Sequence, residues 1–174
     1  LLSGEPAPLS DSSLSVMSVV PARVFESRQA VTVDGRFAGV GRVGAGSFVE
    51  VALLGRGGVP ASGVGAVVMN VTAVDPSGWG FLTVYPCGSR PEASSLNYVA
   101  GGSVAVANEV IAKLSGSGSV CVYSYAETDL LIDVVGYVAA STSTPPTTEP
   151  PTTEPPVGGV IVPNVVGLQQ GAAM

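Results

Sequence analysis

The chain of 174 residues carries 13 acidic and 7 basic residues, a net charge of −6, and only 11% of its residues are charged while 46% are hydrophobic. Because no stretch is rich in lysine or arginine, nucleic acids and anionic membrane surfaces are excluded as expected partners. No apolar run reaches the ~20 residues of a membrane-spanning helix, so we expect no membrane insertion. The 23 glycines and 14 prolines, together with abundant valine, favour strands and turns over helices.

Histidine is absent from the chain. This excludes Ser-His-Asp and Cys-His catalysis and the usual histidine-containing zinc sites. Residues 39–44 match the Gly-x-Gly-x-x-Gly pattern, but a β-like run and not a helix follows them, so no helix N-terminus is available to a pyrophosphate. We therefore expect a protein that is not an enzyme and that has neither a metal ion nor a cofactor.

Short β-rich runs follow one another along most of the chain. Residues 1–15 are rich in serine and proline and are expected to be irregular, and the chain becomes apolar at Val16. Strands are then predicted at residues 47–54, 65–74, 79–86, 94–99, 104–114, 119–125 and 129–138. Residues 115–118, Ser-Gly-Ser-Gly, read as a hairpin-type connection. Short strands with turn residues between them indicate a sandwich or a barrel, and we favour an all-β domain, an antiparallel β-sandwich, over residues 16–140.

Two of the predicted strands show which positions face the core. In residues 65–74 every odd position from Val67 to Ala73 is apolar, which is typical of a strand with one buried face. In residues 79–86, Trp79, Phe81 and Tyr85 lie on one face, and Leu82 and Val84 lie on the other.

The two cysteines, Cys87 and Cys121, each lie beside a strand-like run. Two cysteines beside a linker typical of secreted proteins favour a disulfide formed in an oxidising compartment, and two buried free thiols are the alternative. On the chain-entropy model, the disulfide would contribute roughly 3–4 kcal/mol to stability.

Aromatic residues are concentrated on the predicted strands. They include Trp79, Phe81, Tyr85, Tyr98, Tyr123, Tyr125 and Tyr137. Core packing is the ordinary role of such residues, whereas an exposed strip of them would suit stacking against carbohydrate. Trp79, beside the turn at residues 75–78, is the one most expected to be exposed. Trp79 and Tyr98 are therefore candidate ligand contacts.

Two carboxylates, Asp129 and Asp133, share one face of the last predicted strand and are also candidate ligand contacts. At four residues apart on a strand they lie about 13 Å apart, too far for a glycosidase pair. Turn capping and, for Asp133, a buried hydrogen-bonding role are the ordinary interpretations, and calcium binding is the open alternative. Asn70, Asn97 and Asn108 interrupt apolar runs; they are expected to bond to backbone at sheet corners, with a sugar or calcium site as the alternative.

The composition changes sharply at Ser141. Residues 141–159 contain a tandem Thr-Thr-Glu-Pro-Pro repeat without core-forming residues, which predicts a disordered or extended polyproline-II stalk. At ~3.1 Å per residue such a stalk is about 50 Å long and holds a domain away from a surface or a neighbour. The chain begins with Leu1 and not with methionine, so we expect either a removed signal peptide or an internal fragment.

Several motifs are shared with one known type of domain. They include Pro-Ala-Arg-Val-Phe-Glu-Ser-Arg at 21–28, Asn-Val-Thr-Ala at 70–73, Gly-Phe-Leu-Thr-Val-Tyr-Pro-Cys-Gly at 80–88, and Thr-Asp-Leu-Leu-Ile-Asp-Val-Val-Gly-Tyr at 128–137. Over residues 20–138 the chain thereby resembles a β-rich accessory domain of secreted and surface proteins of actinobacteria, in which Asp-Thr is usual where this chain has Glu26-Ser27. Such domains are appended to secreted enzymes, amidases or adhesin-like chains.

The final segment, residues 160–174, contains Val-Pro-Asn-Val-Val-Gly-Leu-Gln-Gln-Gly-Ala at 162–172. It resembles the opening of a PASTA domain, a module that binds peptidoglycan or acts as a spacer in cell-wall proteins, and is expected to be a truncated PASTA-like segment. Together these features predict an extracellular, non-catalytic module of the cell surface or cell wall. It would bind peptidoglycan or another cell-wall glycan, or mediate adhesion. The alternative is a purely structural accessory domain of a larger secreted enzyme or receptor.

Overall fold

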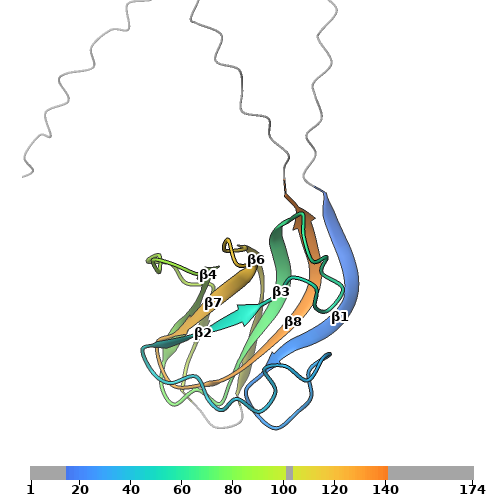
Figure 1. Ribbon diagram of the computed structural model, residues 1–174. Coiled ribbons are helices and arrows are strands. Elements are labelled where there is room, and N and C mark those ends of the chain that lie inside the picture. Colours follow the sequence, from blue (N-terminus) through green and yellow to red (C-terminus); the bar gives the residue numbers. More distant parts are fainter. Residues whose placement is uncertain (1–14, 101–103, 141–174) are drawn as a thin grey trace, which may run out of the picture. The chain divides into compact units, whose positions relative to one another are not determined.

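The computed structural model describes residues 15–100 and 104–140, which form an antiparallel β-sandwich of two four-stranded sheets (Figure 1). The first sheet has the order β1 (Val16–Glu26), β8 (Asp129–Ala139), β3 (Val64–Val74) and β6 (Ala105–Lys113). The second has the order β2 (Ser47–Ala52), β7 (Ser119–Ser124), β4 (Gly80–Pro86) and β5 (Leu96–Tyr98). The predicted fold class is confirmed. The expectations for the stalk, the PASTA-like segment and residues 1–14 lie outside the described residues.

The core lies between the two sheets and consists of alternating inward-facing side chains. On β3, the odd positions Val67, Met69, Val71 and Ala73 are fully buried, as their spacing predicted. Partners on other strands include Phe25 on β1, Leu130 and Ile132 on β8, Leu82 on β4, and Val51 and Val120 on β2 and β7. Each such side chain contributes about 1.5–3 kcal/mol when it is buried, so this alternation fixes the register of the strands. Within residues 15–100 and 104–140, no helix is long and apolar enough to cross a bilayer.

The first and last strands are neighbours in the first sheet. They run antiparallel, and Val16 at the start of β1 pairs with Val138 near the end of β8. The described part of the chain therefore begins and ends at the same end of this sheet (Figure 1).

The turn at residues 115–118 forms, but the hairpin expected there was wrong. The Gly118 amide donates to the Ser115 carbonyl at 2.9 Å, and the chain reverses as predicted. However, β6 pairs with β3, whereas β7 pairs with β2 and β4 in the other sheet. Turn residues determine where a chain reverses, but the partner of each strand depends on packing between residues far apart in sequence.

A buried arginine, Arg56, ties three segments together at one end of the sandwich. Its side chain is 2% exposed, and its guanidinium forms an ion pair with Asp34, with an Nε–Oδ2 distance of 2.6 Å. It also donates to the carbonyls of Ala52 at 2.7 Å and Val24 at 2.8 Å, and it lies over the Phe37 ring. Hydrogen bonding to Arg56 holds the pKa of Asp34 at about 2, below its ordinary value of 3.8.

We expect the protein to lose stability on acidification in a range set by Asp34. Because the pKa of Asp34 is lower in the folded state than in the unfolded state, its contribution is complete above about pH 4 and is lost as the pH falls towards about 2. Urea unfolding at pH 7, 4 and 2.5 measures this loss. Asp34→Asn should flatten the dependence in that range, and a variant as acid-sensitive as the wild type would contradict the assignment.

Candidate functional site

Four aromatic rings form a continuous array on the outer face of the second sheet. The Trp79 ring stacks on Tyr125 with centroids 5.3 Å apart, and Tyr125 stacks on Phe81 at the same spacing. Phe81 then contacts Tyr123 at 6.0 Å. We call these four residues the aromatic array. It exists because Phe81 and Tyr123 occupy the strand positions that alternate with core residues, so their side chains face outward.

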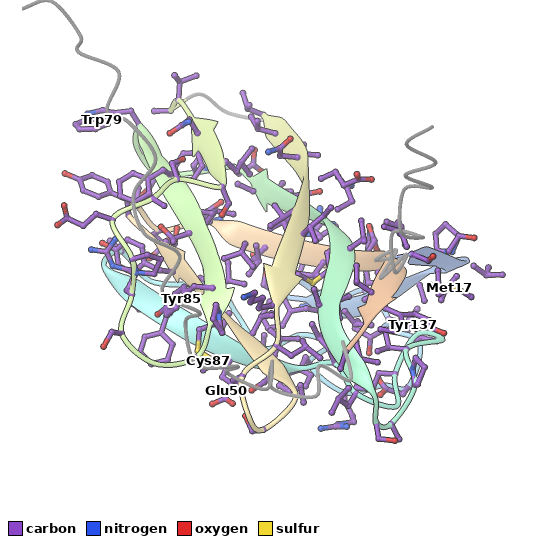
Figure 2. All side chains as sticks on the ribbon, turned by 90° about the horizontal axis from the view of Figure 1, so that it is seen from above. Met17, Glu50, Trp79, Tyr85, Cys87 and Tyr137 are labelled. Carbon is purple, nitrogen blue, oxygen red and sulfur yellow. A yellow bond between two sulfur atoms is a disulfide. The ribbon has the colours of Figure 1, made fainter. Side chains whose placement is uncertain are left out.

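The aromatic array is open to solvent. Trp79 is 69% and Tyr125 is 44% exposed, while Phe81 and Tyr123 are half-buried. Trp79 lies at the periphery of the molecule in Figure 2, as its place beside a turn predicted. Phe48, 59% exposed, lies opposite Tyr123 in the pairing of β2 with β7 and extends the same face. Clusters of exposed aromatic side chains are typical of binding surfaces, so this face is the candidate functional site.

The position of Tyr125 is fixed from below by Tyr98. Tyr98 is only 4% exposed, and its hydroxyl accepts a hydrogen bond from the Ala126 amide at 3.1 Å and shares another with Ser124 Oγ at 2.9 Å. A side chain at Gly80 would come within about 3 Å of both the Tyr98 and Tyr125 rings, so glycine permits this close approach. Tyr98 is therefore a core residue that supports the array. Its role as a direct ligand contact stays a prediction.

A loop at residues 87–95 crosses the same face and covers part of it. The predicted disulfide between Cys87 and Cys121 is confirmed, with Cα atoms 4.9 Å apart, and it anchors one end of the loop to β7. Near the other end, Thr83 Oγ1 donates to the Ala93 carbonyl at 2.6 Å. The side chains of Thr83 and Cys121 are buried beneath this loop although they point away from the core.

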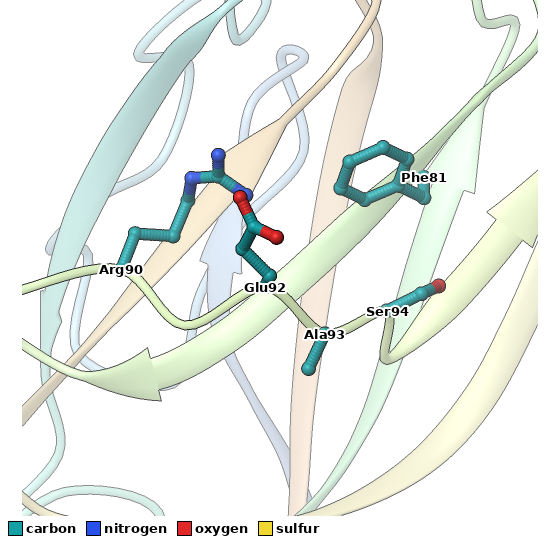
Figure 3. A pocket seen from close by; sticks show the side chains of 5 residues that line it. All are labelled: Phe81, Arg90, Glu92, Ala93 and Ser94. Carbon is teal, nitrogen blue, oxygen red and sulfur yellow. The ribbon is translucent and has the colours of Figure 1, made fainter.

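A pocket of about 310 Å³ lies where the loop meets the aromatic array. Its lining, drawn in Figure 3, consists of Phe81, Arg90, Glu92, Ala93 and Ser94. One aromatic ring therefore lies beside a guanidinium, a carboxylate and a hydroxyl. Asn97, opposite Phe81 on β5, accepts a hydrogen bond from Ser94 Oγ at 2.9 Å and adds an amide to this edge. An apolar surface with a few convergent polar groups is the usual composition of a small-ligand site.

The two candidate carboxylates lie on the first sheet, apart from this pocket. Asp133 accepts two hydrogen bonds from Arg23, at 2.8 and 3.0 Å, across the pairing of β1 with β8. Asp129 accepts from Ser27 Oγ at 2.7 Å and from Arg42 at 2.8 Å. Both carboxylates are thus engaged in structural ion pairs, so the four predicted contact residues do not form one site.

The side chains of two of the three asparagines considered in the sequence, Asn97 and Asn108, form hydrogen bonds. Asn108 Nδ2 donates to the Ser95 carbonyl at 2.7 Å, which is the backbone-bonding role. Asn97, in contrast, lies at the edge of the pocket described above.

Among the described residues, one group of three side chains has the spacing of metal ligands: Glu50, Cys87 and Cys121. The two sulfur atoms form the disulfide, and metals bind cysteine as the free thiolate. Glu50 accepts a hydrogen bond from Ser119 Oγ. This group is therefore a structural cluster around the disulfide.

Comparisons of the chain with protein-family models, with curated proteins and with solved structures each found no match. The candidate site is therefore defined by the chain's own geometry. Its loop residues, Arg90 and Glu92, carried no sequence signal, because they belong to no strand pattern. Phe81, Tyr123 and Tyr125 were among the aromatic residues for which an exposed strip was the alternative to core packing. The period of two in residues 79–86 and 119–125 supports that alternative, because it places Phe81 and Tyr123 on the face opposite the core residues Leu82 and Val122.

Proposed function

We propose that this domain is a non-catalytic glycan-binding module, with peptidoglycan or another cell-wall glycan as its partner. The observation that carries the proposal is the exposed aromatic array beside a pocket of polar side chains. Pyranose rings have apolar C–H faces and polar hydroxyl edges, so they suit a surface on which an aromatic ring lies beside hydrogen-bonding groups. Adhesion through a glycan is one form that this function would take.

The array favours binding because its rings are already in place. The Tyr125 amide donates a hydrogen bond to the Phe81 carbonyl at 3.0 Å. The next amide along the chain, that of Ala126, donates to the Tyr98 hydroxyl. Side chains that are ordered before binding lose little entropy on binding, which raises affinity. In this proposal one sugar stacks on Trp79 or Tyr125, and the hydroxyls of a neighbouring sugar reach Arg90, Glu92 or Ser94.

The composition of the pocket supports binding without hydrolysis. Glycoside hydrolysis ordinarily needs two carboxyl groups about 5–10 Å apart. Glu92 is the one carboxylate among the side chains that line the pocket. An extracellular location is also part of the proposal, since structural disulfides form and persist in oxidising compartments.

Trp79→Ala is expected to weaken glycan binding by about thirtyfold, equivalent to about 2 kcal/mol, the loss typical of an exposed aromatic hot spot. Pull-down on purified peptidoglycan and a glycan array identify the ligand, and calorimetry then measures the affinity of the wild type and variant. Ile111→Ala is the matched control, because Ile111 is 62% exposed on β6 in the other sheet.

Unchanged binding by Trp79→Ala would exclude Trp79 as a contact, and unchanged binding by Trp79→Ala/Tyr125→Ala would exclude the array as the contact surface. If the wild type bound no glycan or cell-wall preparation, the proposed function would fail, and a purely structural accessory domain would be the remaining interpretation.

A further inference from the structure

Arg90 differs from most other basic residues of the domain in what surrounds it. Arg23, Arg28, Arg42 and Arg56 each form an ion pair with a carboxylate. Within the described residues, no carboxylate lies within ion-pair distance of Arg90. Its guanidinium carbon lies 4.3 Å from the centre of the Tyr123 ring, at one end of the aromatic array. The site therefore holds a cation whose charge is not neutralised by an ion pair.

Stacking on Tyr123 leaves the binding groups of Arg90 available. A guanidinium over an aromatic ring uses its flat face for the contact, while its N–H groups point outward in the plane. The backbone around it is also held, because the disulfide at Cys87 and the hydrogen bond from Thr83 to Ala93 anchor the loop on both sides. Arg90 is thus positioned before any ligand arrives, and its outward N–H groups match a planar pair of oxygen atoms.

The neighbour of Arg90 in the pocket limits the anion that fits. Glu92 lines the same pocket, so its carboxylate repels a second negative group. A carboxylate carries one negative charge, whereas a phosphate monoester carries about 1.5–2 negative charges at neutral pH. The Glu92 carboxylate therefore repels a phosphate monoester more strongly. Glu92 also accepts hydrogen bonds, which suits a hydroxyl or amide hydrogen beside the carboxylate of the ligand.

We infer that the glycan recognised on this face is acidic and carries a carboxylate, which Arg90 binds through its N–H groups while a neighbouring sugar ring stacks on the aromatic array. This inference rests on the proposed function, because it names the class of glycan bound at that same site. Arg90 is the specificity-determining residue, and Trp79 supplies affinity for acidic and neutral sugars alike.

The test compares pairs of probes that differ only in charge. Purified peptidoglycan is used untreated and after its carboxylates are converted to amides, and an oligogalacturonate is used beside its carboxyl-reduced form. A phosphorylated mannan forms a third arm. The wild type should bind the carboxylated member of each pair that it recognises about tenfold more tightly, and added salt should weaken this preference.

Arg90→Gln should lower the affinity for each carboxylated probe to that for its neutral form, because glutamine can still hydrogen-bond to hydroxyls but carries no charge. Glu92→Gln should strengthen binding to carboxylated probes. The matched control is Arg36→Gln, because Arg36 also lies over an aromatic ring, Phe37, at 5.5 Å, but away from the aromatic array.

Each other outcome overturns a defined part of the inference. Equal binding of charged and neutral forms by the wild type would refute carboxylate recognition and leave the proposed function intact. Preference for the phosphorylated mannan would replace carboxylate by phosphate as the ligand group. Equal weakening of both forms by Arg90→Gln would make Arg90 a structural residue, and absence of binding in every arm would refute the proposed function itself.

Discussion

Replacing Cys87 and Cys121 together by serine is expected to lower the free energy of unfolding by roughly 3–4 kcal/mol, because the disulfide closes a loop between residues 34 positions apart. Urea unfolding measures this change directly. Thermal unfolding with and without reductant is a second measurement, in which reduction should lower the midpoint by roughly 10 °C or more.

The same double variant is expected to bind glycan more weakly even where it is folded. The disulfide anchors the loop that carries Arg90 and Glu92, so its removal releases these side chains from the edge of the aromatic array. Binding is measured at a temperature where circular dichroism shows the variant to be native. Ser119→Ala is the control, because it removes the hydrogen bond from Ser119 to Glu50 next to the disulfide but leaves the disulfide itself in place. Native affinity in a folded double variant would show that the disulfide does not position the loop.

Arg56→Ala is expected to lower the free energy of unfolding by about 2–4 kcal/mol, because it leaves a buried carbonyl without its donor and removes a buried side chain from the packing, while the solvent-exposed Asp34 carboxylate adds less. The truncation leaves the Asp34 carboxylate without its cation and removes a donor from the buried Val24 carbonyl. Urea unfolding at pH 7 measures the loss. Arg36→Ala is the matched control, because Arg36 contacts the same Phe37 ring from an exposed position, and it should change stability by no more than about 0.5 kcal/mol.

A double-mutant cycle with Asp34→Asn tests whether the ion pair is the cause. The two substitutions should be strongly non-additive, since each removes the same interaction. Additive losses, or a loss below about 1 kcal/mol for Arg56→Ala, would show that packing of the arginine side chain matters more than its charge.

Much of the fold was predictable because burial follows the period of two in the sequence. The apolar odd positions from Val67 to Ala73 indicated a strand with one buried face, and the structure buries all of them. The predicted strand boundaries lie close to the observed ones for the same reason. The strand predicted at residues 47–54, for example, contains β2, Ser47–Ala52. The separation of β6 from β7 was not predictable, because the turn between them is compatible with one sheet or with two.

The site was predictable only in part. The position of Trp79 beside a turn indicated its exposure correctly. The burial of Tyr98 could have been predicted, because its spacing from Leu96, with polar Asn97 between them, places it on the same face as a core leucine. Arg90 and Glu92 lie in a loop without periodicity, and they reach the aromatic array only because a disulfide and strand pairing bring distant segments together.

The adjacency of Val16 and Val138 determines how the domain would respond to mechanical force. A pull applied to the chain before β1 and after β8 acts at one end of an antiparallel pair, so the hydrogen bonds between these strands would break one after another and not all at once. Peeling of this kind needs little force. The second sheet behaves differently, because the covalent link between Cys87 and Cys121 limits how far the intervening segment can extend. A stretched molecule would therefore lose its outer strand β1 early, while the loop beside the aromatic array stays tethered to β7.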